Sequence, residues 1–154
     1  MSTPVSPSGP PGLPVTFRPT LTRIVLMSLG TALLVVLTAV SFLLDTATAG
    51  DRASFIGTGV LIFAFLGLLS RPKVVATQEG VTVVNLTTKR RLEWAQIVRV
   101  TLRPGDAWVH LDLADGTSLP AMGIQPGMAK DQAIANARAL RALVEEHGTG
   151  VSST

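Results

Sequence analysis

The chain has no cysteine, and this absence excludes disulfide bonds, catalytic thiolates and zinc–thiolate sites. Charged residues are also scarce. They make up 15% of the 154 residues, compared with roughly 25% in an ordinary soluble domain, while 47% of the residues are hydrophobic. A composition low in charge and rich in hydrophobic residues predicts segments that lie in a membrane. The net charge of +3 comes without a basic stripe, which argues against a nucleic-acid partner.

Motifs that support catalysis are lacking too. His110 and His147 lie far apart with no HExxH pairing, and neither a G-x-S-x-G nor a P-loop motif occurs. Asp112 and Asp115 are spaced for opposite sides of a strand or its turn, so they do not form an obvious acid/base pair. The sequence therefore predicts a protein that is not an enzyme and that uses no metal and no cofactor.

Two long apolar runs are present, at residues 24–44 and 53–69, and neither contains a charge. A bilayer core of about 30 Å needs about 20 apolar residues in a helix. The eight-residue loop between the runs can only join antiparallel spans, so residues 21–70 are predicted to form a transmembrane hairpin. Gly57 and Gly59 are candidates for close helix packing. Ala47-Thr48-Ala49 resembles a signal-peptide cleavage site, so cleavage of the first span stays open.

Basic residues flank the two runs on their outer sides, and the loop between the runs is net negative. The flanking cations are Arg18, Arg23, Arg71 and Lys73. The positive-inside rule then predicts a multi-pass protein of the cytoplasmic membrane with both termini in the cytoplasm. Residues 1–20, which contain six prolines, are predicted to be a disordered cytoplasmic tail.

From residue 71 onward, short β-branched runs alternate with turn signals. Val98, Val100 and Leu102 fall on one face of a strand, and a second run around residues 109–113 alternates in the same way. Asp115-Gly116 is typical of a two-residue type I′ hairpin. We expect about six to seven antiparallel strands and then an amphipathic helix over 129–147, before a second disordered tail at 148–154.

Three stretches carry a resemblance to known proteins: "FRP" (17–19), "RPKVVATQEGVTV" (71–83) and "RRLEWAQIVRV" (90–100). A strand, a Glu-Gly turn, a second strand and a W-x-x-I step resemble bacterial PH-like domains, and the whole resembles the actinobacterial membrane-protein family of the low-molecular-weight protein antigen 6. The resemblance implies an α+β fold over residues 71–147, a bent antiparallel split barrel with a C-terminal capping helix. Its expected structural residues are Gly80, Trp94, Ile97 and Gly116.

Two groups of side chains are candidates for binding. Lys89, Arg90 and Arg91 form the densest basic run, which is either a solvated hairpin tip or a contact with anionic lipid headgroups. A second group would gather on the polar face of two paired strands and could bind a protein. Its members are Arg99, Arg103, Trp108 and His110.

Together these observations predict a PH-like interaction module that is anchored in the bilayer and docks an unknown membrane or envelope protein at the cytoplasmic face of the membrane. The alternative function is binding of anionic lipid headgroups or of a small ligand by the same domain.

Overall fold

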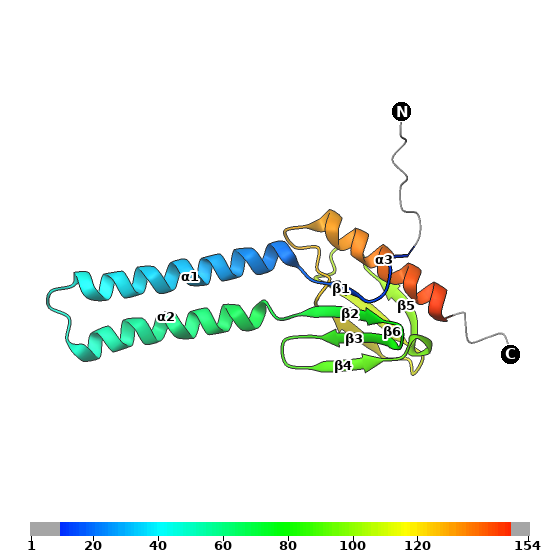
Figure 1. Ribbon diagram of the computed structural model, residues 1–154, viewed down its shortest axis with the longest axis horizontal. Coiled ribbons are helices and arrows are strands. Elements are labelled where there is room, and N and C mark those ends of the chain that lie inside the picture. The colour runs from blue at the N-terminus through cyan, green and yellow to red at the C-terminus, as the bar shows by residue number, and fades with distance from the viewer. Residues whose placement is uncertain (1–9, 149–154) are drawn as a thin grey trace, which may run out of the picture.

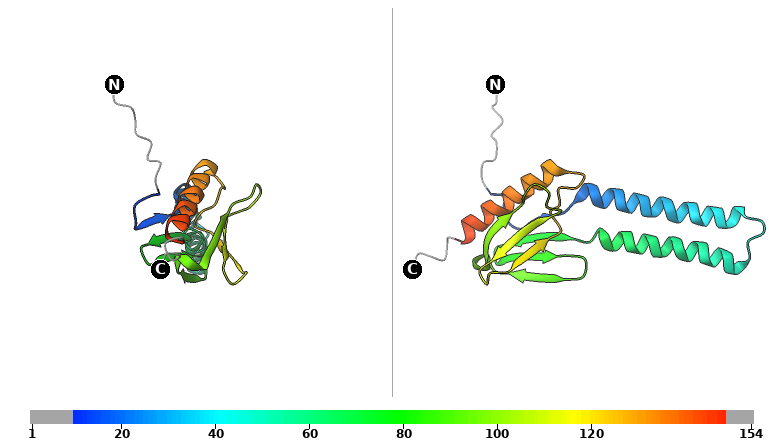
Figure 2. Two further views of the ribbon diagram at one scale, coloured as in Figure 1. Left: turned by 90° about the vertical axis from the view of Figure 1, so that its right-hand side faces the viewer. Right: turned by 180° about the vertical axis from the view of Figure 1, so that it is seen from behind.

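A computed structural model describes residues 10–148 of the chain. The chain folds into two long helices, two small sheets and a third long helix. Figure 1 shows the helical hairpin on one side and the strands with the third long helix on the other. Figure 2 shows the same separation from behind. The predicted architecture, an α-helical hairpin followed by bent antiparallel strands and a C-terminal capping helix, is confirmed.

The hairpin consists of α1 (Thr20–Leu43) and α2 (Ala49–Leu69), which lie side by side. Each helix begins four residues before its apolar run, so the connection is shorter than the predicted eight-residue loop. The reason is local capping. The Thr48 hydroxyl accepts a hydrogen bond from the Asp51 amide, and the Asp51 carboxylate accepts one from the Thr48 amide, so α2 starts within the polar segment.

The two helices touch through small residues and leave most of their apolar side chains outside. Gly59 is buried, and a Cβ there would lie 2.9 Å from Leu34 Cδ1, whereas a Cβ on Gly57 would meet nothing within 4 Å. Of the two glycines proposed for close packing, only Gly59 therefore serves it. The most apolar 18-residue windows of α1 and α2 are only 11% and 6% buried. By length and composition both helices could cross a membrane.

The first sheet has the order β1-β2-β3-β4 and is antiparallel throughout. Its strands are β1 (Val15–Phe17), β2 (Lys73–Thr77), β3 (Gly80–Val84) and β4 (Lys89–Leu92). Strand β1 corrects the prediction of a disordered tail over residues 1–20, because residues 15–17 pair with β2. Phe17 lies opposite Val74 and is buried. Three residues between Pro14 and Pro19 are too few to show a strand period, and residues 1–9 lie outside the described part.

The second sheet has the order β5-β6-β7. Its strands are β5 (Ile97–Thr101), β6 (Val109–Leu113) and β7 (Ser118–Ala121), and a short 3₁₀ turn, η1 (Trp94–Gln96), leads into β5. The predicted alternation was wrong at Val98, which is 66% exposed. The pairing of β5 with β6 shifts between Ile97 and Arg99, and this bulge turns Ile97 rather than Val98 into the core.

The turn between β6 and β7 also differs from the type I′ turn predicted at Asp115-Gly116. A type I′ turn needs a positive φ at both central residues, and here only Gly116, at φ +83°, has one. The Gly116 amide donates to the Leu113 carbonyl (3.0 Å) and the Leu113 amide donates to the Thr117 carbonyl (2.8 Å). This pattern fits a type I turn closed by a glycine bulge. Such a loop is longer than the two-residue turn that the Asp-Gly pair predicts.

Helix α3 (Lys130–Gly148) closes the open end of the two sheets by packing on β5 and η1. One stripe of the helix is buried with the strands in a single core. The stripe consists of Ala133, Ala137, Leu140, Leu143 and Val144. The helix matches the expected one within a residue at each end, and residues 149–154 of the expected tail lie outside the described part.

Candidate functional site

The corner before β5 is held by Trp94, which is 6% exposed. Its Nε1–H lies 3.1 Å from the Thr77 carbonyl oxygen and 3.2 Å from that of Gln78, so it ties the corner to the β2–β3 turn. The His147 ring of α3 stacks on the indole with centroids 4.8 Å apart. At Gly80 a Cβ would collide with the Leu92 carbonyl oxygen. The burial of Trp94 and Ile97 and the tight space at Gly80 support the predicted structural role of these residues, which stays a prediction, as does that of the turn residue Gly116.

Asn85 is a residue that sequence reasoning missed. It is 8% exposed, and its side chain joins the two sheets. Nδ2–H donates to the Pro120 carbonyl (2.8 Å), and Oδ1 accepts from the Met122 amide (3.1 Å). A polar residue at the end of an apolar strand in the sequence was the only available signal. Its partners, 35 and 37 residues away in the chain, become visible only in the fold.

The basic run Lys89, Arg90 and Arg91 lies along β4, at the edge of the first sheet, and all three residues are exposed. They therefore form a strand edge rather than the tip of a hairpin. Acidic residues lie near two of them. A hydrogen bond from the Thr77 side chain is the main cause that lowers the pKa of Glu79, and the charge of Arg91 adds to it. The charge of Arg91 is the last of the causes that act on Glu79, so this carboxylate interacts only weakly with the run.

The predicted group Arg99, Arg103, Trp108 and His110 is only partly brought together. Arg103 and His110 line one shallow cavity of about 310 Å³ with Asp106 and Asp112. There the Thr101 hydroxyl donates to Asp112 Oδ2 (3.1 Å), and His110 Nδ1 lies 3.9 Å from Asp106 Oδ2. Trp108 precedes β6, is half-buried and does not line this cavity. Arg99 faces a different groove.

That groove runs between β5 and α3, and its volume is about 490 Å³. Val98 and Arg99 contribute from the bulged strand and Arg141 and Val144 from the helix, with Arg103 at one end. Strand β5 pairs only with β6, so its other edge borders the groove. There Arg141 Nη2 donates to the Val100 carbonyl oxygen (2.9 Å). Sequence reasoning did not include the helix residues, because nothing local relates Arg141 to a strand 41 residues earlier.

The charged side chains that line the groove are mainly cationic. Three guanidinium groups, those of Arg99, Arg103 and Arg141, line it together with one carboxylate, that of Glu145. Its walls contain no histidine. Over residues 10–148, no three side chains of His, Asp or Glu gather in a way that could hold a metal ion. The arrangement suits recognition of a negatively charged ligand that lies along a strand.

Part of the chain is similar to known proteins. Residues 71–143 match the family model described as "Bacterial PH domain". Uncharacterised proteins of Mycobacterium tuberculosis and Mycobacterium bovis are 29% identical to the chain over 97 residues, which cover 63% of this chain. The match covers 62% of the length of these curated relatives. No solved structure matches the chain.

The comparisons confirm the predicted resemblance to bacterial PH-like domain proteins, and the mycobacterial relatives fit an actinobacterial family. The part of the chain that matches contains both sheets except β1, and most of α3. PH-like domains are in general non-catalytic interaction modules.

Proposed function

We propose that this chain, which carries a bacterial PH-like domain, is a membrane-anchored interaction module that docks a protein partner at the cytoplasmic face of the cell membrane and catalyses no reaction. The partner's chemistry follows from the groove between β5 and α3. A strand with an unpaired edge can accept an extended segment through main-chain hydrogen bonds. The surplus of arginines along the groove favours a segment with acidic side chains. The observation that carries the proposal is this arginine-lined edge of β5, with which no strand pairs and at which Arg141 occupies one carbonyl oxygen, that of Val100.

Membrane anchoring rests on the surface of the hairpin. Large apolar side chains such as Val35, Phe42 and Leu61 point outward, and in water they would remain exposed. At 1.5 Å per residue, 24 and 21 helical residues extend about 36 and about 31 Å, which suits a bilayer core of about 30 Å. Both helix ends next to the sheets carry basic residues, so the domain and the described N-terminal segment would face the cytoplasm.

A photo-crosslinking amino acid at Val98, in the full-length chain in native membranes, tests the docking proposal. We expect it to capture an acidic, extended segment of a partner, and the same probe at the exposed Ala95, outside the groove, should not capture it. A synthetic peptide of that segment should bind the purified chain in nanodiscs. Arg99→Glu together with Arg103→Glu should weaken this binding about tenfold or more.

The matched control is Lys130→Glu together with Arg138→Glu, which reverses two exposed cations on α3 that do not line the groove. Binding that falls equally in this control would assign the effect to net charge instead of the groove. Capture of a segment without acidic residues would overturn the proposed partner chemistry. Release of the chain from membranes by alkaline carbonate would overturn the anchoring.

The alternative function, binding of anionic lipid headgroups or a small ligand by the domain, is favoured by one observation. Lys89, Arg90 and Arg91 are exposed along β4, with Lys89 and Arg91 on one face of the sheet and Arg90 on the other, and none of them forms a salt bridge within the described residues. Neutralising all three should abolish liposome binding by the domain if this function holds, and should leave peptide docking at β5 unchanged.

A further inference from the structure

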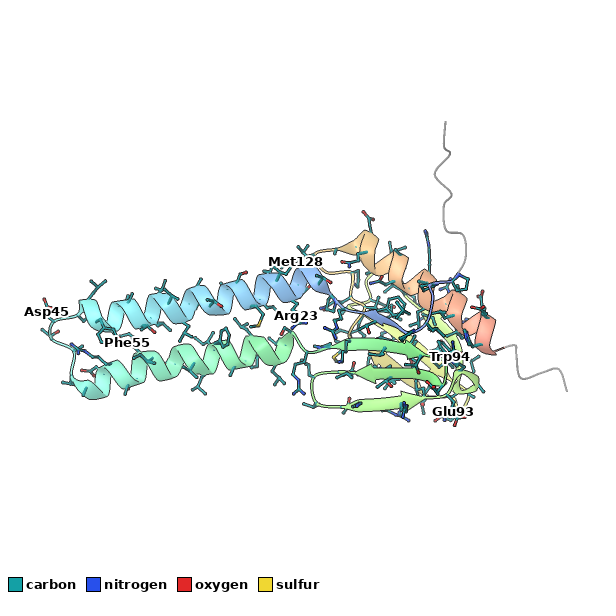
Figure 3. All side chains as sticks on the ribbon, viewed as in Figure 1. Arg23, Asp45, Phe55, Glu93, Trp94 and Met128 are labelled. Carbon is teal, nitrogen blue, oxygen red and sulfur yellow. The ribbon has the colours of Figure 1, made fainter. Side chains whose placement is uncertain are left out.

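A second cavity lies where the hairpin meets the first sheet, and the proposed docking of a partner does not use it. Its volume is about 410 Å³. Arg18, Arg23, Arg71 and Lys73 line it, and no acidic residue does. Figure 3 shows Arg23 at this junction, whereas Asp45 is at the opposite end of the hairpin. Four positive charges converge here from segments that are more than 45 residues apart in sequence.

The fold fixes the backbones that carry these cations. Arg18 follows β1 and Lys73 begins β2, and the two strands are paired, with Phe17 opposite Val74. Arg71 follows the end of α2, where its amide donates to the Leu68 carbonyl (3.1 Å). The floor is closed by Met27 of α1 and Ser70, whose Sδ and Oγ atoms are 3.8 Å apart. The fold therefore brings the backbones of these four residues to one junction, although the side chains of Arg18, Arg23 and Arg71 are exposed.

The charges are also uncompensated by protein. Within residues 10–148 none of the four cations forms a salt bridge or a side-chain hydrogen bond. Helix α1 begins beside them with no side-chain cap and no acidic residue in its first turn, in contrast to α2 with its Thr48–Asp51 capping box. The positive end of α1 thus adds to the potential of the cluster. Such a cavity favours a compact anion with several acceptor oxygens.

We propose that this junction cavity binds the phosphate group of an anionic phospholipid of the cytoplasmic leaflet. The shared chemistry is a phosphate anion, and the source is lipid because the cavity opens at the ends of the two helices that we propose to span the bilayer. Its volume lies within the usual range for small-ligand sites. A bound headgroup would fix the orientation of the PH-like domain against the membrane. This inference rests on the proposed anchoring but not on the proposed protein partner.

The test uses the full-length chain, purified and delipidated in a zwitterionic detergent, and titrated with phosphatidylglycerol or phosphatidylcholine in mixed micelles. A Lys or Arg near an anionic surface contributes about 1 kcal/mol, or about fivefold in affinity. Arg23→Gln with Arg71→Gln should therefore weaken binding of phosphatidylglycerol about thirtyfold. Phosphatidylcholine should bind weakly to every variant.

Lys130→Gln with Arg138→Gln is the matched control, because it removes the same charge from exposed positions on α3 that do not line the cavity. It should change affinity less than about threefold. Arg18→Gln with Lys73→Gln, both outside the helices, provides a second pair in case the first disturbs insertion. Equal losses in the control, or no loss in either cavity pair, would overturn the proposal.

Inorganic phosphate and glycerol 3-phosphate distinguish the two sources of the anion. We expect neither to displace phosphatidylglycerol at millimolar concentration. Displacement by inorganic phosphate with an affinity like that of the lipid would assign the cavity to a soluble anion and overturn the lipid inference. Crosslinking at Val98 and extraction with carbonate report separately on partner docking and on anchoring, so failure of those proposals is distinguishable from failure of this one.

Discussion

The helical hairpin and the PH-like domain place the same kinds of residue in opposite ways. In the hairpin, large apolar side chains such as Val35 and Leu61 face outward and Gly59 lies at the contact between the helices. In the domain, Val74 and Leu111 are fully buried. The difference follows from the solvent that we propose for each part. Lipid provides no hydrophobic drive to hide apolar groups, so close packing through small residues holds the helices together.

The two parts also satisfy their polar groups differently. Ser41, which is buried in the hairpin, donates to the Thr38 carbonyl of its own helix at 2.7 Å. Asn85 in the domain instead reaches backbone groups of another sheet. A helix satisfies its backbone locally, whereas small sheets need partners distant in sequence. The hairpin should therefore tolerate some substitutions that destabilise the domain, and the domain should tolerate some substitutions that disturb the hairpin.

The largest expected effect is that of Trp94→Ala. Removing a buried aromatic side chain costs about 3–5 kcal/mol, and the two carbonyls near Nε1 lose their donor. Thermal unfolding of the domain in the full-length chain should shift down by more than about 12 °C. The control variant is Phe65→Ala, because Phe65 lies on α2, outside the domain, and is 60% exposed. That variant should leave the melting temperature of the domain unchanged, and similar shifts in the two variants would argue against separate solvents.

Replacing an outward-facing valine by lysine tests the difference between the hairpin and the domain directly. Val60→Lys near the middle of α2 should disfavour membrane insertion by about 2.5–3.5 kcal/mol. Val98→Lys, at the exposed bulge of β5, should change the stability of the domain by less than about 0.5 kcal/mol. The measurements are the fraction of chain that resists carbonate extraction and the midpoint of chemical unfolding. Normal insertion of Val60→Lys would contradict a lipid-facing α2.

A smaller effect is expected from overpacking the contact between the helices. Gly59→Leu forces α1 and α2 apart at Leu34 and should cost about 1–3 kcal/mol, whereas Gly57→Leu faces open space. Because the chain has no cysteine, spin labels on one introduced cysteine in each helix report the distance between the helices without interference. The distance should grow in the first variant only. A shift in both would mean that Gly57 also lies at a helix contact.

The smallest effect concerns the turn between β6 and β7. The Thr117 hydroxyl donates to Asp115 Oδ1 (2.6 Å), and this bond is the main cause that lowers the pKa of Asp115 below 3.8. The hydrogen bond to the ionised Asp115 therefore stabilises the turn fully at pH values above the unfolded pKa of Asp115. Its contribution is lost as the pH falls through the folded pKa. Thr117→Val should raise the pKa in an NMR titration, while Thr87→Val, in another exposed turn, should not move it. An unchanged pKa of Asp115 in Thr117→Val would show that the Thr117 hydroxyl does not lower it.

Much of the fold was predictable because it follows from local patterns. Long uncharged runs gave the two helices, and alternation around residues 109–113 gave β6. The prediction was wrong where contacts with residues distant in sequence override the local pattern. Residues 15–17 became a strand through pairing with β2, and Val98 turned outward because Ile97 fills the corner beside Trp94. Candidate binding residues were harder still, since Arg99 shares its groove with Arg141 rather than with Trp108.

Local patterns along the chain are enough to predict two apolar helices and a small antiparallel domain, because the period and length of apolar runs reflect the solvent and the backbone geometry of each segment. The groove between β5 and α3, and the four cations that line the junction between the hairpin and the first sheet, arise only in the folded chain. Those sites depend on contacts between residues tens of positions apart. Pairing of β1 with β2 and packing of α3 on β5 create them, and no local pattern in the chain encodes either contact.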